Sequence, residues 1–193
     1  MNAMKGLLCL LFMCASTLVS AQITDTAINK DKFEKSDFPY KGDRVLIVDR
    51  IDGSKEENIF VFAKNKKGSE QDILYIQQFT KVDDKWESKV SEEVADEGII
   101  TVTYNNRKAF KDVEKNGQVD ALYIYAKHDK DDLNNPNEEI GLLFYKYQLY
   151  TVTVRADSDF KKNYFSDNFK KLPKPVQDFV LDYWNKYVSN GRR

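Results

Sequence analysis

An acidic turn of nine residues, 112–120, constrains the fold of this chain more than any other stretch. Side chains with oxygen atoms occupy its positions one, three, five and nine, and a glycine occupies position six. This spacing is typical of a loop that wraps a calcium ion, or that folds as if it did. Residues 121–126 follow at once, and their aromatic and branched side chains predict a β-strand. An acidic turn that leads directly into a strand is typical of small repeated β-modules, so the sequence predicts sheet structure here.

The same turn is a candidate calcium site, because calcium takes about six to eight oxygen ligands. Gly117 allows the sharp bend, where a positive φ can be required. Three features argue that this is not an EF-hand. They are Lys115 inside the turn, the glutamate at position three and Tyr123 at position twelve. Two alternatives remain, a bound calcium ion or a turn that keeps the shape without the ion. The candidate ligands are the side chains of Asp112, Glu114, Asn116 and Asp120 and the backbone carbonyl of Gln118.

Residues 1–21 have the pattern of a secretory signal peptide. Lys5 supplies the positive charge, and residues 6–15 form an apolar core of about ten residues, too short to span a bilayer. Small residues at 19–21 form a cleavage site that leaves Gln22 as the new N-terminus. The alternatives are an uncleaved anchor and a lipoprotein acylated on Cys14, although bulky residues before Cys14 disfavour acylation. The sequence therefore predicts export, to the periplasm or the cell surface of a Gram-negative bacterium.

The position of the cysteines and the pattern of charges exclude some kinds of chemistry and some classes of partner. Cys9 and Cys14 are the only cysteines and lie within the predicted signal peptide, so the mature chain is expected to lack disulfides and a cysteine nucleophile. The formal net charge is −1, and acids and bases are interleaved without a basic stripe, which argues against nucleic acid. Beyond residue 21 no apolar segment is long enough to cross a membrane as a helix.

The rest of the chain predicts a lead-in at residues 22–42 and a single β-rich domain at 43–193. The lead-in is polar, with scattered aromatic residues, and is expected to be irregular. In the domain, runs of β-branched and aromatic residues alternate with turn-forming residues. Two units of about four strands are expected, 43–90 and 97–155. The predicted strands cover residues 44–49, 58–63, 72–79 and 86–90 in the first unit, and 99–104, 119–126, 142–147 and 150–155 in the second.

The two predicted units match in kind, at an offset of about 63 to 69 residues. Residues 60–64 correspond to 123–127, residues 73–76 to 142–145, and residues 86–90 to 150–154. The loop at 127–139 is longer than its counterpart in the first unit, and this extra length accounts for the increase of the offset along the chain. The pattern predicts an internal duplication, and the alternative is that all antiparallel meanders look alike.

The period of apolar residues changes at the C-terminus and predicts a helix over residues 175–188. Pro175 suits the first helical turn, where its missing N–H costs nothing. The predicted helix is expected to pack on one face of a sheet. Its apolar stripe consists of Val176, Phe179, Val180, Tyr183, Trp184, Tyr187 and Val188.

Other candidate groups point to binding more than to catalysis. The polar loop 127–139 is a candidate surface for a glycan or protein partner. His128 is the only histidine, is expected at the surface, and excludes a multi-histidine metal cluster. The chain has no Gly-x-Ser-x-Gly elbow and no glycine-rich phosphate loop. Trp86, Tyr104 and Tyr150 are candidates for stacking on sugars, provided that they lie on a wet face of a strand.

The motif at residues 110–125 resembles the acidic-turn repeats of FG-GAP and VCBS-like proteins. Together with the predicted hairpin of residues 142–155 and the closing segment 172–184, the chain is also similar to small exported bacterial proteins labelled as surface polysaccharide biosynthesis proteins. The resemblance covers about residues 43–188. The chain departs from the family pattern at Glu114, and its first unit has no intact acidic turn. The resemblance implies an envelope or glycan connection and implies no catalytic residue.

Together these patterns predict a mainly β (α+β) fold, with antiparallel sheets from two related β-units and a C-terminal helix. A sandwich-like pair of sheets or a single curved sheet suits this length. The expected function is that of an exported, non-enzymatic envelope protein that binds a glycan or a protein partner. A hydrolase or transferase that acts on surface polysaccharide, and a purely structural periplasmic domain, are the alternatives.

Overall fold

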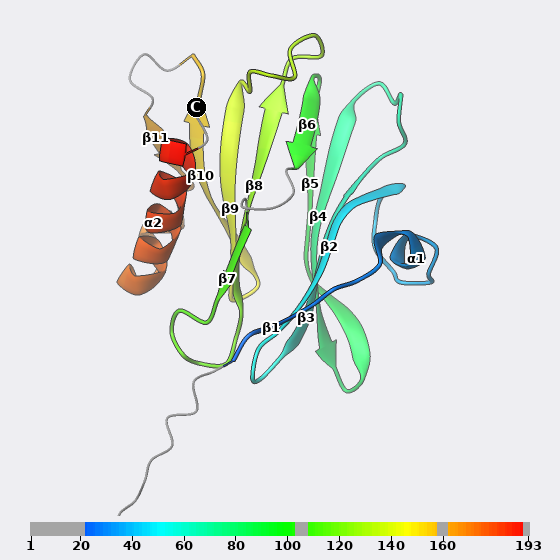
Figure 1. Cartoon of the computed structure of the whole chain (residues 1–193), viewed down its shortest axis with the longest axis vertical. Helices are drawn as coiled ribbons and strands as arrows, with labels where there is room; N and C mark the ends of the chain where they lie inside the picture. The colour runs from blue at the N-terminus through cyan, green and yellow to red at the C-terminus, as the bar shows by residue number, and fades with distance from the viewer. Residues whose placement is uncertain (1–21, 103–107, 158–161, 191–193) are drawn as a thin grey trace, which may run out of the picture.

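The protein consists of two antiparallel β-sheets that pack face to face (Figure 1). The computed structural model describes residues 22–102, 108–157 and 162–190, so the predicted signal peptide lies outside the described residues. The first sheet has the order β1 (Thr24–Thr26), β2 (Arg44–Asp52), β3 (Glu57–Lys64), β4 (Asp72–Val82) and β5 (Lys85–Asp96). The second has the order β11 (Asn163–Phe165), β10 (Gln148–Arg155), β9 (Glu138–Tyr145), β8 (Asp120–His128) and β6 (Ile99–Val102), and β7 (Lys108–Lys111) also pairs with β8.

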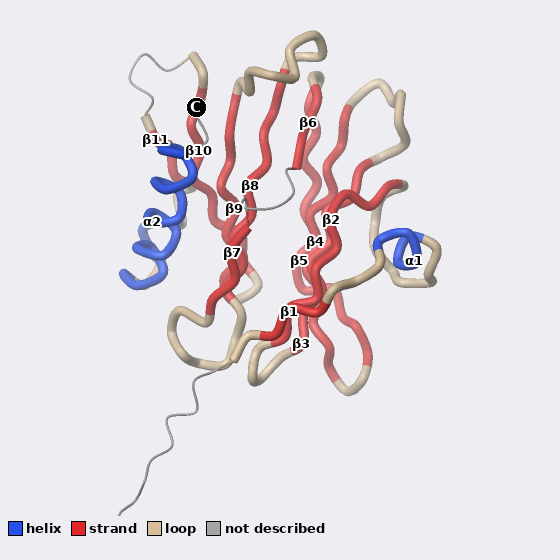
Figure 2. Tube along the Cα trace, viewed as in Figure 1, coloured by secondary structure: helices blue, strands red, loops and turns tan. Residues whose placement is uncertain are grey.

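A helix covers the outer face of each sheet, so four layers lie side by side (Figure 2). The longer helix, α2 (Lys174–Asn190), lies on the second sheet, and the short helix α1 (Lys30–Glu34) lies on the first. This arrangement confirms the predicted mainly β fold of antiparallel sheets with a C-terminal helix. No helix among the described residues is long and apolar enough to cross a membrane.

The core between the sheets is aromatic. Phe62 of β3 and Tyr123 of β8 have ring centroids 4.6 Å apart, and Phe60 and Phe144 have centroids 5.1 Å apart. The central strands β3 and β8 are buried on nearly every residue, because a sheet covers one face and a helix layer covers the other. That double burial explains why both strands are apolar or aromatic along most of their length rather than strictly alternating.

The C-terminal helix docks through the apolar stripe that its sequence predicts. Val176, Val180 and Trp184 are buried against the outer face of the second sheet. Trp184 also donates a hydrogen bond from Nε1 to Asn163 Oδ1 at 3.0 Å. Gly141 of β9 leaves room for this ring, since a Cβ there would lie 3.0 Å from Trp184 Cε3. The helix therefore ties β9, β11 and the C-terminal segment into one body.

The lead-in is more ordered than its polar sequence predicts. It contributes strand β1 at the edge of the first sheet and helix α1 on the outer face of that sheet. Phe33 is buried there, and its ring centroid lies 4.9 Å from that of Phe38, which in turn meets Phe79. Asn29 caps α1 by accepting a hydrogen bond from the backbone N–H of Lys32. Phe33, Phe38 and Tyr40, the scattered aromatic residues of the lead-in, thus form the cover of this face.

The two halves share one strand order. β3, β4 and β5 form a meander in the first sheet, as β8, β9 and β10 do in the second. In each meander a preceding strand pairs with the first member, namely β2 with β3 and β6 with β8. The pairs of segments that the sequence aligns occupy equivalent strands. A gene duplication stays a prediction, because antiparallel meanders of separate origin share this order.

Candidate functional site

The predicted acidic turn lies between β7 and β8, at the end of the molecule that we call the turn end, with turns 53–56 and 83–84 and residues 146–147 (Figure 1). The turn is closed by its own side chains. Asp112 accepts hydrogen bonds from the backbone N–H of Asn116 at 2.9 Å and of Gly117 at 2.7 Å. Asp120 accepts one from the N–H of Val113 at 2.9 Å. Lys115 and Gly117 both have positive φ, at 55° and 88°, so the sharp bend predicted at Gly117 is present.

The acidic turn also joins the two sheets. The N–H of Lys55, in the β2–β3 turn, donates to Gly117 O at 3.1 Å, and the N–H of Val119 donates to Glu56 Oε1 at 3.0 Å. A Cβ at Gly117 would lie 2.6 Å from Lys55 Cγ, so the close approach of the turns needs glycine as much as the backbone angle does. The turn therefore has a structural role in holding the sheets together.

Glu114 is turned toward a cation of the protein itself. Its Oε2 lies 2.8 Å from Lys146 Nζ and accepts a hydrogen bond from Tyr145 Oη at 2.8 Å. The hydrogen bond from Lys146, followed by that from Tyr145, holds the pKa of Glu114 below its ordinary value. Lys146 thus supplies Glu114 with the positive charge that an ion would supply, and calcium would have to displace it.

Asp120 is the least solvated of the candidate ligands. Its pKa is raised to about 7, chiefly by burial and also by the negative charges of Asp112 and Glu114, against the lowering effect of the hydrogen bond from Val113. The candidate ligands Asp112, Asn116, Gln118 and Asp120 share this one turn, and Asn116 Oδ1 accepts the N–H of Gln118 at 2.8 Å. Among the described residues no three His, Cys, Asp or Glu side chains converge as metal ligands. Calcium binding here stays a prediction, which a chelator tests.

The opposite end of the sandwich, which we call the loop end, carries the connections 65–71, 97–98 and 129–137 (Figure 1). Between them lies a cleft of about 490 Å³, here named the basic cleft. It receives residues from the start of β2, the β3–β4 loop, the start of β6 and the β8–β9 loop. The charged residues that line it are Arg44, Lys64, Lys66, Lys67, Lys130, Glu70 and Asp72.

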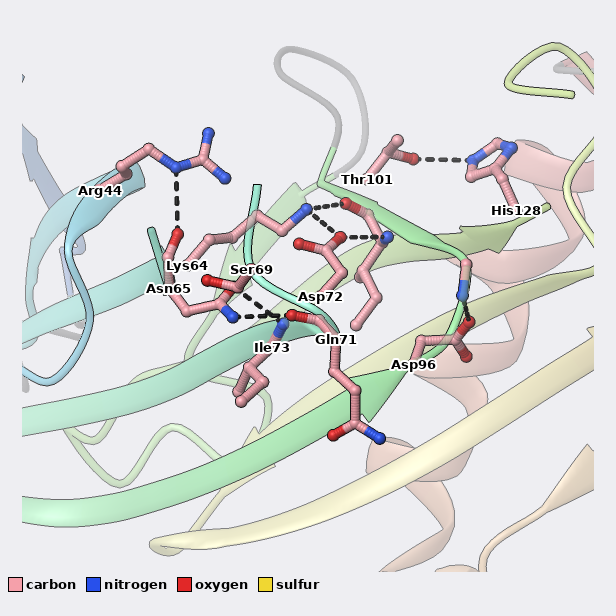
Figure 3. Close-up of polar contacts among 12 residues, drawn as sticks. Arg44, Lys64, Asn65, Ser69, Gln71, Asp72, Ile73, Asp96, Thr101 and His128 are labelled. Atoms are coloured by element: carbon pink, nitrogen blue, oxygen red, sulfur yellow. Dashed lines mark hydrogen bonds and ion pairs between the residues drawn. The ribbon is translucent and has the colours of Figure 1, made fainter. Parts of the chain in front are cut away.

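A buried ion pair lies at the wall of the basic cleft (Figure 3). Lys64 is 5% exposed, and its ammonium pairs with Asp72 and donates to the carbonyl of Ile100 at 2.8 Å. Asp72 Oδ2 also accepts the N–H of Ile100 at 2.7 Å. Lys64 and Asp72 belong to the first sheet and Ile100 to the second, so this group fixes the two sheets at the loop end.

A second hollow of about 500 Å³ adjoins the predicted binding loop 127–139. Lys127 Nζ lies 3.3 Å from Asp96 Oδ2, and Arg155 Nε lies 2.7 Å from Glu138 Oε1. Asn137, in the loop itself, lines the same hollow. Four of the five charged residues that line this second hollow are paired with each other, and the fifth, Asp157, gives it one excess negative charge.

Two of the sequence expectations about single side chains are wrong. His128 was expected at the surface, but it is 6% exposed, and its Nε2 is hydrogen-bonded to Thr101 Oγ1 at 2.9 Å (Figure 3). Tyr150 was a candidate for sugar stacking, but the layer that contains α2 buries it. Trp86 is half-buried, with its ring 6.0 Å from that of Phe38, and Tyr104 lies outside the described residues.

The sequence did not single out the basic cleft as a site. Residues 64–68 have the composition of a turn, and Arg44 and Lys130 are far from them along the chain. A run of lysines beside a turn glycine is a weak signal on its own. The cluster exists because strand pairing brings these three segments to one end of the sandwich.

Comparisons with known proteins give no match to the chain. No family model matches it, no curated protein matches it, and no solved structure matches it.

Proposed function

We propose that this protein is an exported, non-enzymatic protein of the bacterial envelope that binds a glycan or a protein partner at the loop end. The observation that carries the proposal is that the loop end gathers connections from both sheets around two adjacent hollows, the basic cleft and the hollow beside loop 127–139. Loops on a rigid sandwich are the usual place for recognition, because they vary without disturbing the core.

The sandwich beneath these loops is held firmly at both ends. The Lys64–Asp72 pair and Ile100 join the sheets at the loop end, and Glu56 joins them at the turn end through the N–H of Val119. A scaffold that does not rearrange spends little binding energy on ordering itself, so its loops can hold a polar ligand with few contacts. This rigidity supports a binding role.

The test is a glycan array, with a pull-down from envelope fractions, using the protein from residue 22 onward. A ligand found there should lose affinity in the loop-end variant Lys130→Ala and keep it in the turn-end variant Lys85→Ala. Both lysines are exposed and form no ion pair with a described residue, so the two variants are matched in charge and burial. Hydrolysis or transfer of a captured polysaccharide would favour the alternative enzyme. Failure to retain any glycan or envelope protein would contradict the proposal.

A further inference from the structure

We propose that the basic cleft binds the anionic groups of an acidic glycan, namely its carboxylate, sulfate or phosphate substituents. This inference rests on the proposed function and narrows it to one cleft and one class of ligand.

The charge balance of the cleft is the first argument. Five cations line it, Arg44, Lys64, Lys66, Lys67 and Lys130, against Glu70 and Asp72. Asp72 is already neutralised by Lys64, so four cations face one free carboxylate. The whole chain has a formal net charge of −1, so this excess is local and does not reflect a generally basic protein. A concave surface lined by one sign of charge concentrates ligands of the opposite sign.

The cations are available to a ligand. Lys66, Lys67 and Lys130 are exposed, and none of them forms an ion pair with a described residue. Arg44 uses Nε to donate to the carbonyl of Asn65 at 3.1 Å, and this bond leaves the outer nitrogens of its guanidinium for a ligand. A guanidinium has five donors in a fixed fork, which suits carboxylate, sulfate and phosphate groups.

The loop that carries two of the lysines is ordered by its own hydrogen bonds. Asn65 Nδ2 donates to the carbonyl of Gln71 at 2.8 Å, and Asn65 Oδ1 accepts the N–H of Ile73 at 3.1 Å (Figure 3). Ser69 Oγ donates to the carbonyl of Lys66 at 2.7 Å. These bonds close the loop around Lys66 and Lys67, so an incoming anion need not order the backbone first.

The acidic residues of the neighbouring loop lie outside the lining of the cleft. Asp132 accepts hydrogen bonds from the N–H groups of Asn134 and Asn135, and from Asn135 Nδ2 at 2.8 Å. Asp129 accepts one from Asn137 Nδ2 at 2.7 Å. Neither aspartate lines the basic cleft, whereas Lys130 between them does. Asp129 and Asp132 are thus bonded within their own loop, and Lys130 is the charged residue of the loop that lines the cleft.

The experiment measures binding of the protein from residue 22 onward to four polymers by biolayer interferometry. Polygalacturonate and dextran sulfate are acidic glycans, dextran is a neutral glycan, and polyphosphate is an anionic polymer without sugar. The test variant is Lys66→Gln/Lys67→Gln/Lys130→Gln. The matched control is Lys35→Gln/Lys85→Gln/Lys170→Gln, which removes the same charge from three exposed lysines outside the cleft.

We expect binding to at least one acidic glycan, weakened about tenfold in the cleft variant and little in the control variant. Raising the ionic strength should weaken the same binding, because exposed charges are screened by salt. Equal losses in the two variants would overturn the inference, since net charge alone would then explain binding. Polyphosphate held as tightly as the acidic glycans would overturn the assignment to a glycan.

The outcomes separate this inference from the proposed function. A neutral glycan from the array that binds wild type and cleft variant equally would overturn the basic cleft as the site and leave the proposed function standing. Absence of binding to every glycan and every envelope fraction would contradict both.

Discussion

The hydroxyl of Tyr123, on β8, donates a hydrogen bond to Asp49 Oδ2, on β2, at 3.0 Å across the interface between the sheets. Asp49 is 8% exposed and also pairs with Lys108 of β7. Burial and the negative charge of Asp49 raise the pKa of Tyr123 well above its ordinary value. This polar group lies beside the aromatic rings of Phe60 and Phe62 between the sheets, so it fixes the relative position of the sheets.

Replacing Tyr123 with Phe should lower the free energy of unfolding by about 1 to 3 kcal/mol, because it removes one partner of a buried carboxylate. Urea denaturation of the protein from residue 22 onward measures the change. Tyr125→Phe is the matched control, since Tyr125 is also buried but its hydroxyl has no hydrogen bond to a described residue. Equal losses in the two variants would show that the bond to Asp49 contributes nothing.

Stability should depend on pH through Asp120. Its folded pKa of about 7 lies above the ordinary value of 3.8, so the folded state holds a proton that the unfolded state releases between these values. This contribution is fully present below about pH 3.8 and is lost as the pH rises through about 7. Asp120→Asn keeps an oxygen for the N–H of Val113 and cannot ionise. With chelator present, wild type should lose stability relative to this variant between pH 5 and pH 8, about 1 kcal/mol or more. Parallel curves would disprove this titration.

Calcium binding to the acidic turn predicts a response to chelation. EDTA should lower the Tm of the wild-type protein, and Asp112→Ala should abolish that response. Asp112→Ala also removes the acceptor for two backbone N–H groups, so its Tm should be lower even without chelator. The comparison is therefore between the shifts caused by EDTA, measured by differential scanning fluorimetry. An unchanged wild-type Tm would leave the turn as a structural element without an ion.

Helix α2 should be essential for folding. Removal of residues 173–193 would expose the outer face of the second sheet, including Leu122, Leu143 and Val152, which are buried under α2. We expect the truncated protein to be insoluble or unfolded. The single substitution Trp184→Ala should cost about 3 to 5 kcal/mol, as large-to-small changes in a core do. A soluble truncated protein with a cooperative unfolding transition would contradict this account of the helix.

Local patterns were enough for most elements of the fold. The helix was predicted from Pro175 and from the spacing of Val176, Val180 and Trp184, because helical periodicity depends only on residues three or four positions apart. Strands β2 to β6 and β8 to β10 and the bend at Gly117 were predicted for the same reason, since turn chemistry depends on residues close in the chain, whereas β7 and β11 were not predicted. The ordered structure of the lead-in was missed because Phe33 and Phe38 are scattered in a polar segment, and their burial depends on a sheet face formed by residues far along the chain.

The amino-acid sequence by itself determined the bend at Gly117, the extended segments of the two meanders and the C-terminal helix, because these follow from backbone preferences and side-chain spacing over a few residues. The tertiary structure decided which side chains are exposed to solvent and which are buried. It buried His128 and Tyr150, and it paired Glu114 with Lys146. It also brought Arg44, Lys66 and Lys130 to one cleft. The physical reason is that burial and charge clustering depend on the pairing of strands far apart in the chain, which local preference does not encode.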